Sequence, residues 1–208
     1  HLGHPCRLTF RPGRSGQGIL FRRSDIPQAP PIPALLARAV QTERRTQLGE
    51  ADAAFHTVEH VLAAVAGAEI DDLVIEMDAA EPPILDGSAR PFLDALQAGG
   101  IVEQWGPVRY LHLRESVRVI DGESVYEAHP ADALRVDVTI DFPHPLIGRQ
   151  HGTYAVTPAS FAAELAPART FGFVHEVEAL RAKGLIRGAS TRNAVVLDAD
   201  GVVDTELR

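Results

Sequence analysis

Apolar positions in the first half of the chain follow the two periods of regular secondary structure. Over residues 57–68 they recur three or four positions apart, which predicts a helix with Thr57 as its N-cap and Gly67 near its end. Residues 73–77 are apolar except for Glu76, which is consistent with a buried strand. Two further strands are expected over residues 6–10 and 18–23, and a second helix over residues 89–97, capped by Ser88.

The pattern changes around Trp105, Gly106 and Pro107, after which strand-like segments dominate. Strands are expected over residues 108–113, 116–120, 124–128, 134–140, 153–157 and 193–197, and helices over residues 160–165 and 174–183. Each half therefore has strands first and two helices later. The sequence predicts an α+β protein with one unit over residues 1–106 and another over residues 107–208.

Composition adds limits on partners and location. The chain has 208 residues, is 45% hydrophobic and carries a net charge of -8, so it reads as a globular protein for which nucleic acid is a poor partner. The single cysteine, Cys6, fits a reducing compartment, and no apolar run approaches the roughly 20 residues of a membrane span. We expect a cytoplasmic monomer. The ends, at His1 and Arg208, look cut rather than natural.

Candidate chemistry centres on the segment from His56 to His60. It places two imidazoles and the carboxylate of Glu59 within five residues, and the expected helix would bring both histidines to one face. Such a set suits a divalent metal with a base beside it, because a bound metal makes hydroxide available near neutral pH. A solvated His/Glu cluster without a metal is the plainer alternative.

Segments elsewhere in the chain extend this pattern. The letters of Thr57-Val58-Glu59-His60 are followed by Ala66-Gly67, by residues 81–89 (EPPILDGSA) and much later by residues 168–173 (ARTFGF), and the chain opens on His1-Leu2-Gly3. Together these motifs resemble the zinc-dependent UDP-3-O-acyl-N-acetylglucosamine deacetylases of bacterial lipid A synthesis, and the resemblance covers essentially the whole chain.

The resemblance implies a fold and a set of catalytic roles. It implies two domains of related topology, each a sheet with two helices packed on it, whose helices meet at an active site between the domains. His60 would be a zinc ligand and Glu59 the general base that takes a proton from the attacking water. Thr170 would hydrogen-bond the oxyanion of the tetrahedral intermediate.

The resemblance also implies substrate contacts. The substrate would be an acylated UDP-sugar whose acyl chain enters an apolar passage formed by the stretch from Phe173 to Val196. The expected substrate-binding residues are His1, Phe171, Phe173, Leu180, Leu185 and Val195. Ordinary core packing is the alternative for the apolar members of this set.

Two segments of the family pattern are missing from these 208 residues. A His-Lys-x-x-x-Asp helix would supply two more zinc ligands, and a Lys-x-Gly-His segment would supply a second proton-transfer histidine. Because catalytic zinc usually has three protein ligands, we expect this polypeptide to be a piece of a working enzyme that binds zinc poorly and turns over slowly or not at all.

Two other readings stay open. A non-catalytic relative would bind the acylated sugar nucleotide without hydrolysing it. An inverted zincin, with the pattern H-x-x-E-H, would use His56 and His60 as zinc ligands and complete the site with Glu115, Glu123 or Glu127.

Overall fold

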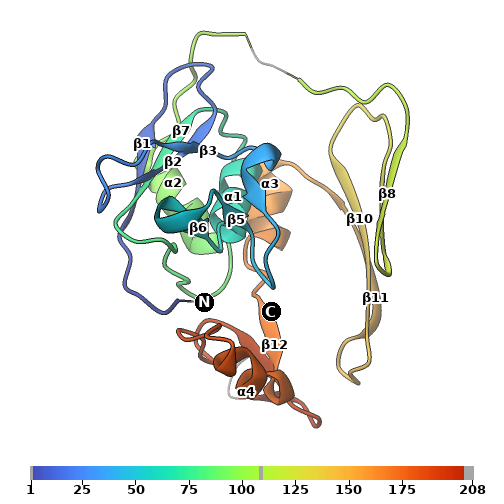
Figure 1. Ribbon diagram of the computed structural model, residues 1–208. Coiled ribbons are helices and arrows are strands. Elements are labelled where there is room, and N and C mark those ends of the chain that lie inside the picture. Colours follow the sequence, from blue (N-terminus) through green and yellow to red (C-terminus); the bar gives the residue numbers. More distant parts are fainter. Residues whose placement is uncertain (1, 108–109, 204–208) are drawn as a thin grey trace.

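The computed structural model describes residues 2–107 and 110–203 (Figure 1). Its first half is built on a four-stranded sheet in the order β1 (Leu8–Pro12), β7 (Leu73–Met77), β2 (Ile19–Arg23) and β3 (Ile32–Pro33). Strand β7 runs antiparallel to β1 and parallel to β2, with Ile75 opposite Phe10 and Phe21. The sheet is therefore mixed, and β7 lies in its interior.

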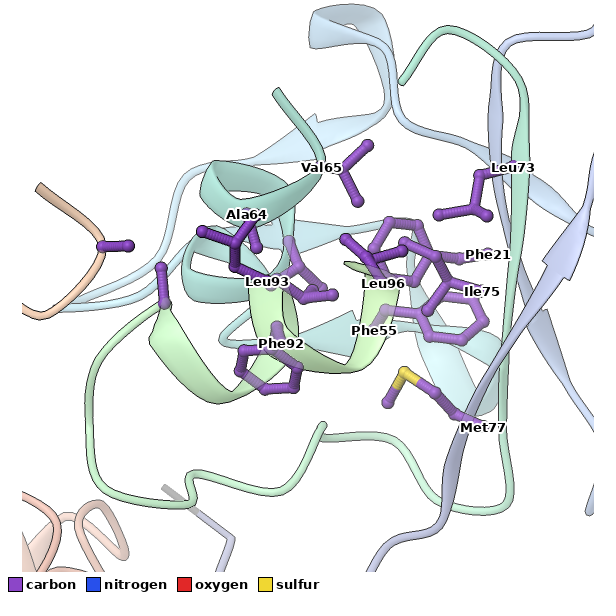
Figure 2. Packing of buried hydrophobic residues seen from close by; sticks show 14 of the residues in the cluster. Phe21, Phe55, Ala64, Val65, Leu73, Ile75, Met77, Phe92, Leu93 and Leu96 are labelled. Atoms are coloured by element: carbon purple, nitrogen blue, oxygen red, sulfur yellow. The ribbon is translucent and has the colours of Figure 1, made fainter. Parts of the chain in front are cut away.

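Two helices, α1 (Glu59–Gly67) and α2 (Arg90–Gly99), pack on each other and share a hydrophobic core with the sheet. Along β7 the side chains of Leu73, Ile75 and Met77 are buried and the two between them are half-buried, which is the alternation of a sheet with one covered face. Figure 2 shows Leu96 of α2 next to Ile75, and both belong to this core. The core fixes the position of α1, whose first turn carries the predicted site.

A second, smaller sheet leads into α1. It has the antiparallel order β4 (Ala39–Val40), β5 (Gln47–Leu48) and β6 (Phe55–His56). The short 3-10 helix η1 (Leu36–Arg38) precedes β4, and η2 (Ala51–Ala53) lies between β5 and β6. The ring of Phe55 is fully buried, with its centroid 5.2 Å from that of Phe21. This contact ties the small sheet to the main one immediately before the site.

A buried arginine strengthens the same junction. Arg23, at the end of β2, makes two hydrogen bonds of 2.6 and 2.7 Å to the carboxylate of Asp25 and donates to the carbonyl oxygens of Asp52 and Ala54. The hydrogen bonds to Asp25 raise the pKa of Arg23, so the guanidinium stays charged although only 7% of the residue is exposed. Arg23 thus attaches η2 and the start of β6 to the main sheet.

The second half consists of smaller units. Strands β8 (Val117–Asp121) and β9 (Ser124–Ala128) form one hairpin, and β10 (Arg135–Phe142) and β11 (Gly148–Ala155) form another. A third sheet has the order β12 (Phe171–Phe173), β13 (Val195–Leu197) and β14 (Val202–Val203), with α4 (Val174–Ala182) after β12. Between these parts lie α3 (Pro158–Ser160) and the π-helical turn η3 (Phe161–Leu165).

The sequence predicted most of these elements. The strands over residues 73–77 and 124–128 have the expected bounds, and both helices of the first half begin one or two residues later than predicted. Two predictions were wrong. Residues 110–113 form no strand, while β11 begins within the loop expected over residues 141–152. Residues 108–109 of the expected strand lie outside the described residues.

The second half also differs from the expectation of one sheet with two helices. Its described residues form three separate sheets, and the β8–β9 hairpin leaves apolar side chains such as Val119 and Val125 more than half exposed. Because both faces of such a hairpin are uncovered, it buries little apolar surface, and little free energy favours its association with further strands. None of the helices in residues 2–107 and 110–203 is both long and apolar enough to cross a membrane.

One contact joins the two halves tightly. Phe161 and Ala166 belong to the buried core of the first half, and the ring of Phe161 lies directly over Gly67 in the last turn of α1. A Cβ atom at Gly67 would lie 2.1 Å from Cδ1 of Phe161. Only glycine lets the ring approach the helix backbone this closely. Gly67 therefore makes room for Phe161, although glycine is a poor helix former.

Gly67→Ala should therefore destabilise the protein, although alanine is the better helix former. We expect a loss of about 1–3 kcal/mol in the free energy of unfolding by urea denaturation, because overpacking outweighs a propensity gain of about 1 kcal/mol. Gly99→Ala is the matched control, since a Cβ at this helical glycine meets nothing within 4 Å. A Gly67→Ala protein at least as stable as the wild type would show that Phe161 is not packed in this way.

Candidate active site

The turn between β6 and α1 is shaped by Thr57. Its φ is 54°, a left-handed conformation that is a genuine outlier for a β-branched residue. The Thr57 hydroxyl donates a 2.6 Å hydrogen bond to Oε1 of Glu81, and both residues are only 7% exposed. Oε2 of Glu81 accepts the backbone N–H of Leu2 at 2.6 Å. Glu81 therefore holds the turn through Thr57 and ties it to the start of the described chain at Leu2.

This geometry corrects two predictions. Thr57 is not the N-cap of α1: Val58 is, and the Thr57 hydroxyl is used by Glu81 instead. His56 does not share a helix face with His60, because it lies in β6, where it pairs with Gln47. The left-handed residue between strand and helix removes the four-residue helical relation on which the inverted-zincin alternative depends.

Glu59 is the first residue of α1, and its carboxylate turns back toward the small sheet. Its Oε2 accepts the backbone N–H of Thr46 at 2.9 Å, and the carbonyl oxygen of Thr46 accepts the N–H of Val58 at 3.3 Å. The other oxygen, Oε1, has no hydrogen-bond donor among residues 2–107 and 110–203. The carboxylate is thus fixed through one oxygen and leaves the other for a substrate or a water molecule.

His60 follows on the helix and is half-buried. Burial lowers the pKa of its imidazole, while the negative charges of Glu59 and Asp86 oppose that shift. His60 lines a small cavity of about 10 Å³ together with Thr57 and Glu81. An imidazole that is neutral near pH 7 is the form that binds a metal ion.

The loop before α2, which contains Asp86 and Gly87, binds the segment around Thr170. The N–H of Thr170 donates to the carbonyl oxygen of Gly87 at 2.9 Å, and Nε of Arg169 donates to the carbonyl oxygen of Asp86 at 2.7 Å. Gly87 has a φ of 83°, and a Cβ there would lie 2.1 Å from the carbonyl oxygen of Asn193. The side chain of Asp86 also acts electrostatically on His60. One loop therefore connects the predicted oxyanion donor to the predicted metal ligand.

The predicted substrate contacts fall into two groups. Phe171 is 40% exposed and Phe173 is half-buried, and their ring centroids lie 5.9 Å apart in an edge-on arrangement. Leu180 and Val195 are 9% and 3% exposed and therefore belong to the core around α4 and β13, while Leu185 is half-buried. His1 lies outside the described residues. Among the described members of this set, Phe171 is thus the most accessible.

The donor set does not by itself fit a catalytic zinc ion. Residues 2–107 and 110–203 contain no group of three His, Cys, Asp or Glu side chains arranged to hold a metal. His60 supplies one suitable ligand, whereas a catalytic zinc ion usually has three from the protein. The inverted-zincin alternative also finds no third ligand at Glu115, Glu123 or Glu127 in this part of the chain.

Sequence reasoning missed two residues that position the site. Glu81 stood inside the quoted EPPILDGSA segment, and a carboxylate before two prolines was the available signal of a buried anchor. Thr46 acts through its backbone N–H, so no side-chain pattern could have indicated it. A separate cavity of about 390 Å³ lies beyond the other end of α1, lined by Glu69 and Asp72, and contains none of the predicted site residues.

Glu59 and His60 are thus adjacent in the first turn of α1, and the backbone of Thr170 is tied to the loop at Gly87. In a comparison with protein families, the model of the LpxC family, UDP-3-O-acyl N-acetylglycosamine deacetylase, matches residues 1–208. The chain belongs to this family, whose members are zinc-dependent.

Named relatives support the assignment. The UDP-3-O-acyl-N-acetylglucosamine deacetylase of Bdellovibrio bacteriovorus is 43% identical over 206 residues, which are 99% of this chain and 68% of the relative. That of Thermosynechococcus vestitus is 43% identical over 208 residues, 100% of this chain and 72% of the relative. A bifunctional LpxC/FabZ enzyme of Chlorobaculum tepidum is 40% identical over 210 residues and is covered over 45% of its length. The chain thus spans only part of the proteins it matches.

The lowered pKa of His60 predicts a pH dependence. The folded protein should bind this proton less readily than the unfolded chain, so stability is fully present above pH 6.5 and falls as the pH drops toward the folded-state pKa. The imidazole resonances of His60, followed by NMR from pH 4 to 8, should titrate with a midpoint below 6.5. A midpoint above 6.5 would mean that Glu59 and Asp86, rather than burial, dominate the pKa.

Proposed function

We propose that this chain supplies the general base and the oxyanion hydrogen-bond donor of an amidase that removes the N-acetyl group from UDP-3-O-acyl-N-acetylglucosamine. The observation that supports it most is the position of Glu59, held through Oε2 by Thr46 and adjacent to His60, in a chain that matches the LpxC family over residues 1–208. The named deacetylases at 43% identity match 99–100% of this chain.

The chemistry follows from the residues themselves. The Oε1 atom of Glu59 takes a proton from a water molecule as the water oxygen attacks the acetamide carbon. The Thr170 hydroxyl donates to the oxyanion that forms there. The proton held by Glu59 then passes to the amide nitrogen as the carbon–nitrogen bond breaks, which releases the amine and acetic acid, and the acid ionises to acetate. His60 is the one metal ligand in this set, and its companions would come from residues other than those described.

The wider organisation belongs to the same proposal. The units over residues 1–106 and 107–208 would be the two domains of related topology, with the site between them. Phe171 and Phe173 would contact the acylated UDP-sugar, and Leu185 would border the acyl chain together with Leu180 and Val195. The protein would act as a monomer in the cytoplasm, without nucleic acid.

A binding protein without catalysis is the second candidate, and the absence of a three-donor metal group in the described residues is what favours it. It would hold the acylated sugar nucleotide through the aromatic and apolar residues alone. Zinc content measured by elemental analysis on the full-length protein separates the two, since about one zinc per chain is expected of the enzyme.

Glu59→Gln tests the base directly, because glutamine keeps an oxygen for the Thr46 N–H but cannot take a proton. In the full-length protein we expect kcat for deacetylation to fall by about 10²–10⁴-fold with zinc content unchanged. His56→Ala is the comparison variant and should keep kcat close to that of the wild type. Full activity of Glu59→Gln would end the proposal.

Thr170→Val removes the hydroxyl while keeping the shape of the side chain. Loss of one oxyanion donor should lower kcat by about 10²–10³-fold and leave KM nearly unchanged, because the interaction forms in the transition state. Thr170→Ser should retain most of the activity. Equal kcat values for the valine and serine variants would exclude the hydroxyl from the reaction.

A further inference from the structure

Two ion pairs link the turn between β4 and β5 to helix α4, which is more than a hundred residues away in the chain. Both amino groups of Arg44 donate to the carboxylate of Glu176, at 2.9 and 2.6 Å. The ammonium group of Lys183 donates to both carboxylate oxygens of Glu43, at 2.8 and 2.9 Å. Adjacent residues of opposite charge on the turn thus meet oppositely charged residues at the two ends of α4.

The turn between β4 and β5 contains a residue in an energetically unfavourable backbone conformation. Arg44 has a φ of 57°, a left-handed value that non-glycine residues rarely adopt. The Thr42 hydroxyl closes the turn by donating to the carbonyl oxygen of Arg45 at 2.7 Å. A residue in such a conformation persists where its surroundings over-determine it, and the two ion pairs to α4 are part of those surroundings.

The far end of this turn reaches the predicted base. Thr46, two residues after Arg44, donates its N–H to Oε2 of Glu59 and accepts the N–H of Val58. The chain of contacts therefore runs from α4, through the charged pairs and the turn, to the carboxylate. It rests on short distances at each step.

We propose that Glu43, Arg44, Glu176 and Lys183 are positioning residues that set the orientation of Glu59 through the Thr46 backbone, so that seating of α4 on the turn adjusts the base. The proposal deepens the proposed function, because it assumes that Glu59 is the base. Each pair is partly exposed, with side-chain exposures of 47% and 24% for Arg44 and Glu176 and of 56% and 51% for Lys183 and Glu43. Exposed pairs are individually weak and salt-sensitive, which suits an adjustable contact better than a permanent anchor.

The test uses charge reversal in the full-length protein. Glu43→Lys opposes Lys183 with a like charge, and the double variant Glu43→Lys/Lys183→Glu restores an attractive pair of inverted polarity. Glu127→Lys is the matched control, since it breaks the equally exposed pair of Arg118 and Glu127 on the β8–β9 hairpin. The first readout is hydrogen exchange of the Thr46 amide, which needs no catalysis. The second is the separation of kcat from KM for deacetylation.

We expect the Thr46 amide to exchange about fivefold faster in Glu43→Lys, to return to the wild-type rate in the double variant and to stay unchanged in Glu127→Lys. The kcat should fall and recover in the same order, with KM nearly constant. Unchanged Thr46 exchange in Glu43→Lys overturns the proposal whatever the enzyme does. If Glu59→Gln is inactive, altered Thr46 exchange with an unchanged kcat in Glu43→Lys also overturns the positioning proposal. If Glu59→Gln is active, the proposed function itself has failed.

Discussion

The hydrogen bond from the Thr57 hydroxyl to Glu81 is the contact on which the site depends. It joins two buried residues and holds a left-handed threonine between strand β6 and helix α1. A β-branched residue in this conformation costs free energy, which the buried, charge-assisted hydrogen bond offsets. Without the sharp change of direction at Thr57, Glu59 and His60 would not occupy the first turn of the helix.

The core explains why that turn can be strained. Strand β7 and the helices α1 and α2 bury a continuous set of apolar side chains (Figure 2). Arg23 and Phe55 attach the small sheet to this core. The site sits where this rigid part meets segments from elsewhere in the chain. Thr46, Glu81, Asp86 and Thr170 all reach it by backbone or carboxylate contacts across long sequence separations. The first half thus provides the packed core that supports the site, whereas strands β8 to β11 of the second half are largely exposed.

Much of this could be predicted from the sequence, and the limits have physical causes. Helical spacing of apolar residues predicted α1, the apolar character of residues 73–77 predicted β7, and the capping residue Ser88 predicted α2. Sequence spacing placed His56 on the helix because a left-handed threonine leaves no mark on hydrophobic spacing. The motif letters predicted Glu59, His60 and Thr170, and the family model matches the segments that contain them. The contact of Thr46 with Glu59 lay beyond the sequence, since it is made by a backbone N–H.

The account is tested most directly by the stability of two variants at Thr57, measured by urea denaturation. Thr57→Ser keeps the hydroxyl for Glu81 and should unfold within about 0.5 kcal/mol of the wild type. Thr57→Val removes it and leaves a buried carboxylate short of one donor, so the free energy of unfolding should fall by about 1–3 kcal/mol. Equal stability of the valine and serine variants would contradict the claim that this hydrogen bond holds the turn.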